Sequence, residues 1–224
     1  MIVSGENVPA AEVSKGVVFV VDDDASVRRG LGSLFRSAGL TVEVFASAAE
    51  MEQSPRSESA NCLVLDVRLP TLNGLELQEL LARSNRQIPI IFITGHADVP
   101  MTVRAMKGGA IDFFTKPVDG RAILDAVSAA IGRDRKRRET EDAGEALRAI
   151  FETLTPRERE VMTLVTAGLM NKQIAAEIGI AEITVKIHRG QIMRKMAAKS
   201  LADLVKMAQA LEIQRTAAPK GPGG

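Results

Sequence analysis

The chain has 224 residues, of which 46% are hydrophobic and 25% charged, a composition typical of globular proteins with one large domain or two modest ones. No apolar run reaches the roughly 18 residues that a membrane span needs, and the N-terminal residues lack the basic start and apolar stretch of a signal peptide. The single cysteine, Cys62, excludes an internal disulfide and fits a reducing compartment, so we expect a cytoplasmic protein without a membrane partner.

The net charge of +1 hides two unlike halves. Residues 1–132 carry 12 Lys and Arg against 16 Asp and Glu, whereas residues 151–224 carry 11 against 7. An acidic front half and a basic back half indicate two domains with different roles. Nucleic-acid binding is expected in the second.

Five short apolar runs in the front half predict five strands, at residues 16–21, 41–45, 61–65, 88–94 and 110–114. Three of them are nearly continuous Val, Ile, Leu and Phe, which is typical of parallel strands buried on both faces. Stretches with helical spacing lie between them, at 27–38, 75–83 and 99–107. This alternation predicts an α/β domain, a five-stranded, doubly wound parallel sheet of the flavodoxin-like class.

A further helix is expected to begin after Asp119, a good N-cap, and to continue into a charged connector that is poor in apolar residues. The sequence then contains only helical patterns. We therefore divide the chain into a first domain at 15–133, a charged helical linker at 134–149 and a small all-α domain at 150–213. The tails, 1–14 and 214–224, are expected to be flexible.

Capping residues predict where the helices of the second domain begin and end. Thr155-Pro156-Arg157-Glu158 is a capping box with proline at the first helical position, and that helix should run to about residue 167, before Gly168. Asn171 is expected to cap a short helix at 172–178, which Gly179 ends. A helix at about 182–198 follows, and Ser200 should cap a last one that ends near residue 211.

Polar residues at the strand ends of the first domain predict a site. Asp22 and Asp23 follow the first strand, Asp66 follows the third, Thr94 ends the fourth and Lys116 follows the fifth. In doubly wound sheets ligands bind beyond the carboxyl ends of the strands. Carboxylates gathered there need a cation, for which Mg²⁺ is well suited, and a hydroxyl and an ammonium can bind phosphoryl oxygens.

The motifs VVDDD, LVLDVRLP, FITGHAD and FFTKP resemble the receiver domain of two-component response regulators over residues 16–133. The resemblance implies that a sensor histidine kinase phosphorylates Asp66. It also implies an acidic pocket of Asp22 and Asp23, in which Mg²⁺ is held by Asp23, Asp66 and the backbone carbonyl of Arg68. Its remaining assignments are Thr94 and Lys116 as phosphoryl contacts, Phe113 as the aromatic switch residue, and a cis Lys116-Pro117 bond.

The second domain resembles the LuxR-type helix-turn-helix of the NarL/FixJ response regulators, over LTPREREVM and GLMNKQIAAEIGIAEITVKIHRGQIMRKM. Val185, Ile192 and Met196 recur at core spacing in the helix at 182–198, and a basic helix in this context is expected to enter the major groove of DNA. The expected groove contacts are Lys186, Arg189 and Ile187, with Thr184 as a further candidate and Lys172, Arg194 and Lys199 at phosphates.

Two positions depart from the usual pattern of that family. Ala181 stands where a capping serine is common, which should cost the helix about 1 kcal/mol. Gly190 stands where some relatives carry a basic residue, and it also lowers helix propensity.

The sequence therefore predicts a phosphorylation-controlled transcription regulator that is not an enzyme. When phosphorylated it would form a homodimer through the surface at 99–114, which the resemblance implies is the dimerisation face. The dimer would bind a palindromic promoter, with RNA polymerase as a further partner. One alternative is a constitutive DNA-binding protein whose receiver serves only as a dimerisation module; the full set of polar strand-end residues argues against it. A metal-dependent phosphatase is the enzymatic alternative, and Arg68 stands where such enzymes usually have a second aspartate.

Overall fold

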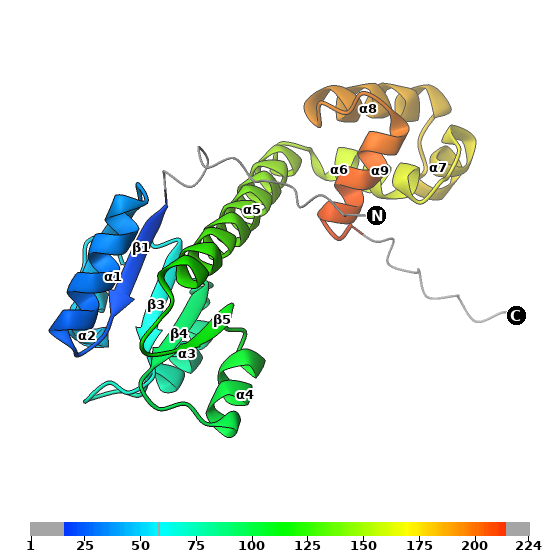
Figure 1. Ribbon diagram of the computed structural model, residues 1–224. Helices are drawn as coiled ribbons and strands as arrows, with labels where there is room; N and C mark the ends of the chain where they lie inside the picture. Colours follow the sequence, from blue (N-terminus) through cyan, green and yellow to red (C-terminus); the bar gives the residue numbers. More distant parts are fainter. Residues whose placement is uncertain (1–15, 58, 214–224) are drawn as a thin grey trace, which may run out of the picture. The chain divides into compact units, whose positions relative to one another are not determined.

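The computed structural model describes residues 16–57 and 59–213 of the chain (Figure 1). Its first part is built on five parallel strands in the order β2-β1-β3-β4-β5. This confirms the predicted sheet. The strands are β1 (Val17–Val21), β2 (Thr41–Phe45), β3 (Cys62–Asp66), β4 (Ile90–Thr94) and β5 (Asp112–Thr115).

Helices cover both faces of this sheet, which explains why the central strands read as continuous apolar runs. One face packs against α1 (Ala25–Ser37) and α5 (Gly120–Glu152), and the other packs against α2 (Ala48–Glu52), α3 (Gly74–Arg83) and α4 (Val99–Lys107). Every residue of β3 and β4 is buried. The short helix α2, which Ser47 caps, is an element that the sequence patterns did not predict.

Helix α5 is continuous from Gly120 to Glu152, and the side chain of Asp119 accepts a hydrogen bond from the backbone N–H of Ala122 at 2.8 Å, as expected of an N-cap. The chain separates into two compact units between Arg137 and Arg138, within this helix. The predicted tails lie outside the described residues. No helix in the described ranges is both long and apolar enough to cross a membrane.

The second unit is entirely helical in its described part. Its own apolar core includes Leu147 and Phe151, which come from the end of α5. The other helices are α6 (Pro156–Thr166), α7 (Asn171–Ile178), α8 (Glu182–Lys195) and α9 (Leu201–Ala210). The predicted capping box of Thr155 and Glu158 and the Ser200 cap are both present.

Two details of this unit correct the sequence-based expectations. Helix α8 ends at Lys195 instead of near residue 198, because Ala197 adopts a left-handed backbone conformation (φ 53°) that no glycine signals. Asn171 is the first residue of α7 and does not cap it. The cap position is Met170, whose N–H donates to the side chain of Gln173 at 2.8 Å.

Candidate metal centre and nucleic-acid interface

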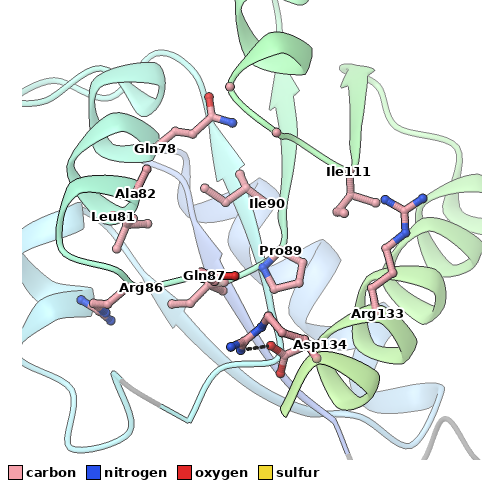
Figure 2. A pocket seen from close by; sticks show the side chains of 14 residues that line it. Gln78, Leu81, Ala82, Arg86, Gln87, Pro89, Ile90, Ile111, Arg133 and Asp134 are labelled. Atoms are coloured by element: carbon pink, nitrogen blue, oxygen red, sulfur yellow. Dashed lines mark hydrogen bonds and ion pairs between the residues drawn. The ribbon is translucent and has the colours of Figure 1, made fainter. Parts of the chain in front are cut away.

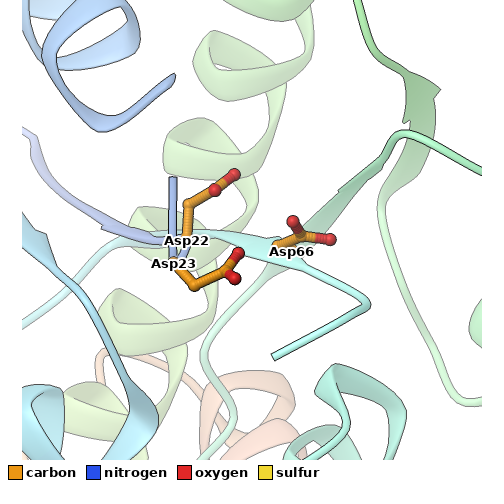
Figure 3. Close-up of side chains that lie close together, drawn as sticks. All are labelled: Asp22, Asp23 and Asp66. Atoms are coloured by element: carbon orange, nitrogen blue, oxygen red, sulfur yellow. The ribbon is translucent and has the colours of Figure 1, made fainter. Parts of the chain in front are cut away.

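Asp22, Asp23 and Asp66 lie together at the carboxyl ends of β1 and β3 (Figure 3). The two strands are direct neighbours, with Val21 opposite Leu65, so the residues that follow them meet at the same edge of the sheet. One carboxylate oxygen from each aspartate lies within 4.8 Å of the others. The structure thus brings Asp66 next to Asp22 and Asp23, from which the sequence separates it by more than forty positions.

Lys116 completes this cluster from the end of β5. Its Nζ lies 2.6 Å from Asp22 Oδ2 and 2.6 Å from Asp66 Oδ2. Its backbone N–H donates to the carbonyl of Thr94 at 2.8 Å, and the Lys116-Pro117 bond is cis, as the resemblance implied. Burial alone would lower the pKa of Lys116, but its contacts with the two carboxylates outweigh that effect and raise it.

The acidic cluster fits a divalent cation. The ammonium of Lys116 balances one of three negative charges. Asp22 is fully buried, and burial raises the pKa of its carboxyl group despite the opposing contacts with Lys116 and the N–H of Asp24. Three carboxylates that keep net negative charge after pairing with Lys116 supply the oxygen ligands that a hard cation such as Mg²⁺ requires.

Three contacts that the sequence did not reveal hold this site in shape. The N–H of Arg68 donates to Asp66 Oδ1 at 2.9 Å, and Arg28 Nη1 donates to the backbone carbonyl of Asp22 at 2.6 Å. Gly74 packs against the backbone of Asp66, where a Cβ would lie 2.4 Å from the Asp66 carbonyl oxygen. A glycine after Asn73 is the only sequence signal for this close approach.

Thr94 and Phe113 lie on the neighbouring strands. Thr94 is fully buried, and its hydroxyl exchanges weak hydrogen bonds of 3.3 Å with the backbone of His96. Phe113 is half-buried, and its ring packs against Phe92 with a centroid separation of 6.3 Å. The side chain of Thr94 therefore has no strong partner in the described chain that would prevent it from turning to another ligand.

In the second unit, α7, a tight turn at Gly179 (φ 68°) and α8 form a helix-turn-helix. The core residues predicted for α8 are confirmed, since Val185, Ile192 and Met196 are at most 1% exposed. The candidate DNA contacts fall into two groups. The exposed ones are Lys172, Lys186, Ile187, Arg194 and Lys199; Thr184 and Arg189 are half-buried. Lys199 follows α8 instead of belonging to it.

Two polar contacts tie α8 to its neighbours. Arg189 Nη1 donates to the side-chain oxygen of Asn171 in α7 at 2.8 Å. Lys195 Nζ lies 2.6 Å from Glu158 Oε2 of α6, and Glu158 is almost completely buried. Burial favours the neutral form of Glu158, yet hydrogen bonds from Lys195 and Thr155 outweigh it and lower its pKa. Lys195 is thus a structural residue, although in the sequence it looks like one more basic residue of a DNA-binding helix.

Comparison with protein families gives two matches that together cover most of the chain. Residues 18–128 match the response regulator receiver domain, and residues 152–208 match the bacterial regulatory proteins of the luxR family. The first match contains the acidic cluster and Lys116. The second contains the whole helix-turn-helix.

Several known proteins are similar to this chain over nearly their full length. Nodulation protein W of Bradyrhizobium diazoefficiens is 62% identical over 89% of this chain and 88% of its own. The low-resolution structure of the response regulator StyR is 51% identical, with a TM-score of 0.79 over 87% of this chain and 98% of its own. Full-length FixJ from B. japonicum is 38% identical, with a TM-score of 0.54; the match covers 89% of this chain and 98% of the FixJ chain.

Proposed function

The chain belongs to the two-component response regulators that join a receiver domain to a LuxR-type DNA-binding domain, and from this premise we propose that Asp66 is the carboxylate that receives the phosphoryl group. Membership establishes a transcription regulator under phosphorylation control, with a histidine kinase and DNA as partners. The observation that carries the assignment of Asp66 is its position as the last residue of the buried central strand β3, in contact with Lys116. Asp22 contacts Lys116 as well, but it is fully buried, whereas Asp66 keeps a small exposed surface.

At Asp66 a carboxylate oxygen would attack the phosphorus of a phosphohistidine, so that a P–O bond forms as the P–N bond to the kinase breaks. Bound Mg²⁺, held by Asp23, Asp66 and the Arg68 carbonyl beside Asp22, would neutralise charge on the transferring group. Lys116 already touches Asp66 Oδ2 and would shift to a phosphoryl oxygen. The chemistry is therefore mainly positioning and charge compensation.

The signal to the surface would pass through Thr94 and Phe113. The phosphoryl group adds about −1.5 to −2 charges. The Thr94 hydroxyl, which has only 3.3 Å contacts to exchange, would turn to bind it, and Phe113 would move into the vacated space. Helix α4 lies next to β5 and exposes apolar side chains, which supports its use as a phosphorylation-dependent dimer surface: Val99 is 76% exposed, Val103 44% and Met106 45%.

For DNA, we propose that α8 enters the major groove with Lys186 and Arg189 at base edges and Ile187 at a thymine methyl group. Thr184 would lie beside them. Lys172, Arg194 and Lys199 would contact phosphates. A dimer on a palindromic promoter would gain affinity by effective concentration, and RNA polymerase would be the next partner.

The contact between Asn171 and Arg189 supports a role for both residues in reading DNA. A guanidinium has five N–H donors, and Asn171 binds only one nitrogen, so the remaining donors stay available in a fixed orientation. Asn171→Ala should therefore relax the base preference at the position that Arg189 reads, whereas Lys172→Ala should weaken all sequences about equally. A randomised DNA library bound by each variant gives the comparison. Equal base preferences in the two variants would contradict this role.

The experiment for the phosphoacceptor compares the parent protein with Asp66→Asn, which is nearly the same shape. Each protein is incubated with acetyl phosphate and Mg²⁺ and weighed intact by mass spectrometry. The parent should gain the mass of one phosphoryl group and Asp66→Asn none. An undiminished phosphoryl adduct on Asp66→Asn would end the assignment.

The same pair of proteins also separates phosphorylation control from constitutive binding. With beryllofluoride, which mimics a phosphoryl group, the parent should dimerise in light scattering and bind its selected DNA more tightly. Asp66→Asn should not respond. A parent protein that is already dimeric and binds equally with and without beryllofluoride would favour a receiver that serves only for dimerisation.

A further inference from the structure

A cavity lies at the amino-terminal ends of β4 and β5, at the opposite end of the strands from Asp66 (Figure 2). It has a volume of about 360 Å³ and is bounded by α3, the loop before β4, the turn before β5, and α5. Ile90 lines it, whereas Thr94, at the other end of the same strand, belongs to the phosphorylation site. A strand of this length separates the two places by roughly 13 Å. The volume falls within the range of small-molecule pockets, roughly 300–1,000 Å³.

The charged residues of this cavity leave one positive charge uncompensated. Three arginines line it, Arg86, Arg133 and Arg137, together with one carboxylate, Asp134. Arg86 is paired with Glu52 outside the cavity, through contacts of 2.7 and 2.6 Å. Asp134 is paired with Arg137 at 2.6 Å. Arg133 is exposed and has no ion pair within the described ranges, so the cavity favours a monoanion.

The rest of the lining is largely apolar. Figure 2 shows Arg86 and Arg133 on opposite sides, with Pro89 and Ile90 between them and Ile111 above Arg133. Arg86 also has a buried Nε–H group that donates to no acceptor in the described chain. A buried donor without an acceptor normally marks the place of a water or ligand. The chemistry that matches this lining is an anionic head on a hydrocarbon body.

We propose that this cavity binds a small organic monocarboxylate, with its carboxylate on the guanidinium of Arg133 and its body over Pro89 and Ile111. Arg133 belongs to α5, one turn before the point where the first unit ends at Arg137. A bound carboxylate would therefore tie this part of α5 to the loop before β4. The receiver would then respond to a small-molecule ligand at a site separate from the phosphorylation site at Asp66.

The first test uses hexanoate, hexanamide and acetate with the full-length protein in ligand-observed NMR and calorimetric titrations. Hexanoate should bind saturably. Hexanamide, which lacks the charge, should bind at least about tenfold more weakly, because a hydrogen bond to a charged group contributes that much or more. Acetate, which lacks the body, should also bind at least about tenfold more weakly, because each buried CH₂ group contributes about 0.8 kcal/mol. Equal binding of hexanamide and hexanoate, or of acetate and hexanoate, would overturn the proposal.

Two matched pairs of variants locate the site. Arg133→Gln should weaken hexanoate binding about tenfold or more, whereas Arg121→Gln, at an exposed arginine of the same helix outside the cavity, should leave it unchanged. Ala82 lines the cavity and is exposed, so Ala82→Glu and Ala82→Gln should both fold. Only the glutamate should repel the ligand. Identical titrations for the members of each pair would refute the site.

Two controls distinguish binding at Arg133 from binding at another place on the protein. Asp66→Asn should bind hexanoate like the parent, because the proposal does not depend on phosphorylation. Light scattering should show the same mass with and without hexanoate. A change in oligomeric state that accompanies the titration, and that Arg133→Gln does not abolish, would mean that the ligand acts elsewhere and would overturn the proposal.

Discussion

Replacing Gly74 with alanine tests whether the turn between β3 and α3 is built against the backbone of Asp66. In the structure, a Cβ on Gly74 would lie 2.4 Å from the Asp66 carbonyl oxygen, 3.1 Å from the Cα of Val67 and 3.2 Å from a side-chain carbon of Leu65. Real Cβ contacts essentially never fall below 3.0 Å, so the two backbones would have to separate by at least 0.6 Å. The oxygen belongs to a buried strand and cannot rotate away.

Overpacking of this kind costs about 1–3 kcal/mol, and alanine would regain only about 0.4–1 kcal/mol by restricting the unfolded chain. We therefore expect a net loss of stability in the first unit. The same displacement moves the carboxylate of Asp66 relative to Lys116, which lies only 2.6 Å away. Phosphorylation by acetyl phosphate should slow by roughly tenfold or more, because misplacement of reacting groups by less than an ångström is costly.

Gly120→Ala is the matched control, since Gly120 is also the first residue of a helix and its Cβ would meet Leu34 at an ordinary 3.5 Å. The chain has no Trp or Tyr, so native-state hydrogen exchange of the β3 amides is a better measure of local stability than fluorescence. Exchange should accelerate in Gly74→Ala only. If the two variants exchange and are phosphorylated alike, the reasoning about the turn is wrong.

Three further predictions concern the helical unit. Ala181→Ser should stabilise it by about 1 kcal/mol in thermal denaturation, because Ala181 has the extended backbone of an N-cap but gives α8 no side-chain acceptor. The lowered pKa of Glu158 means that its stabilising effect is present above the ordinary value of 4.5 and is lost as the pH falls below it. The melting temperature of Glu158→Gln should therefore fall less steeply than that of the parent as the pH is lowered. The same substitution at the exposed Glu160 should leave the pH dependence unchanged. Lys199→Ala should weaken all DNA sequences alike and lower the salt slope by about one, and a sequence-dependent loss would argue against a phosphate contact.

The sheet was predictable because its three central strands, β1, β3 and β4, are buried on both faces, so each of them reads as an apolar run without alternation. Short or weakly marked features were not. Helix α2 has only five residues, too few for a periodic pattern. The end of α8 depends on Ala197 in a left-handed conformation, which alanine does not signal. Sequence patterns thus predict an element when many consecutive residues share one pattern, and they miss an element or boundary that depends on only a few residues.

The acidic cluster was predictable for a different reason. Parallel strands bring their carboxyl ends to one edge, so Asp22, Asp66 and Lys116 were expected to meet once the sheet was inferred. The contact between Gly74 and the carbonyl of Asp66 was not, since it depends on the path of a turn and leaves no chemical mark except a missing side chain. The close approach of two backbone segments can rarely be predicted from a sequence.

Side-chain pairing distinguishes basic residues of α8 that are alike in the sequence. Basic residues on one helix look alike in sequence, yet the structure gives them different roles: Lys195 neutralises the buried Glu158, Arg189 is oriented by Asn171, and Lys186 is exposed and free to meet a ligand. A buried carboxylate must find a cation, and the partner comes from 37 residues away. It follows that the charge available for DNA on α8 is smaller than its composition indicates. The specificity of the helix should therefore depend on a few oriented donors more than on its net charge.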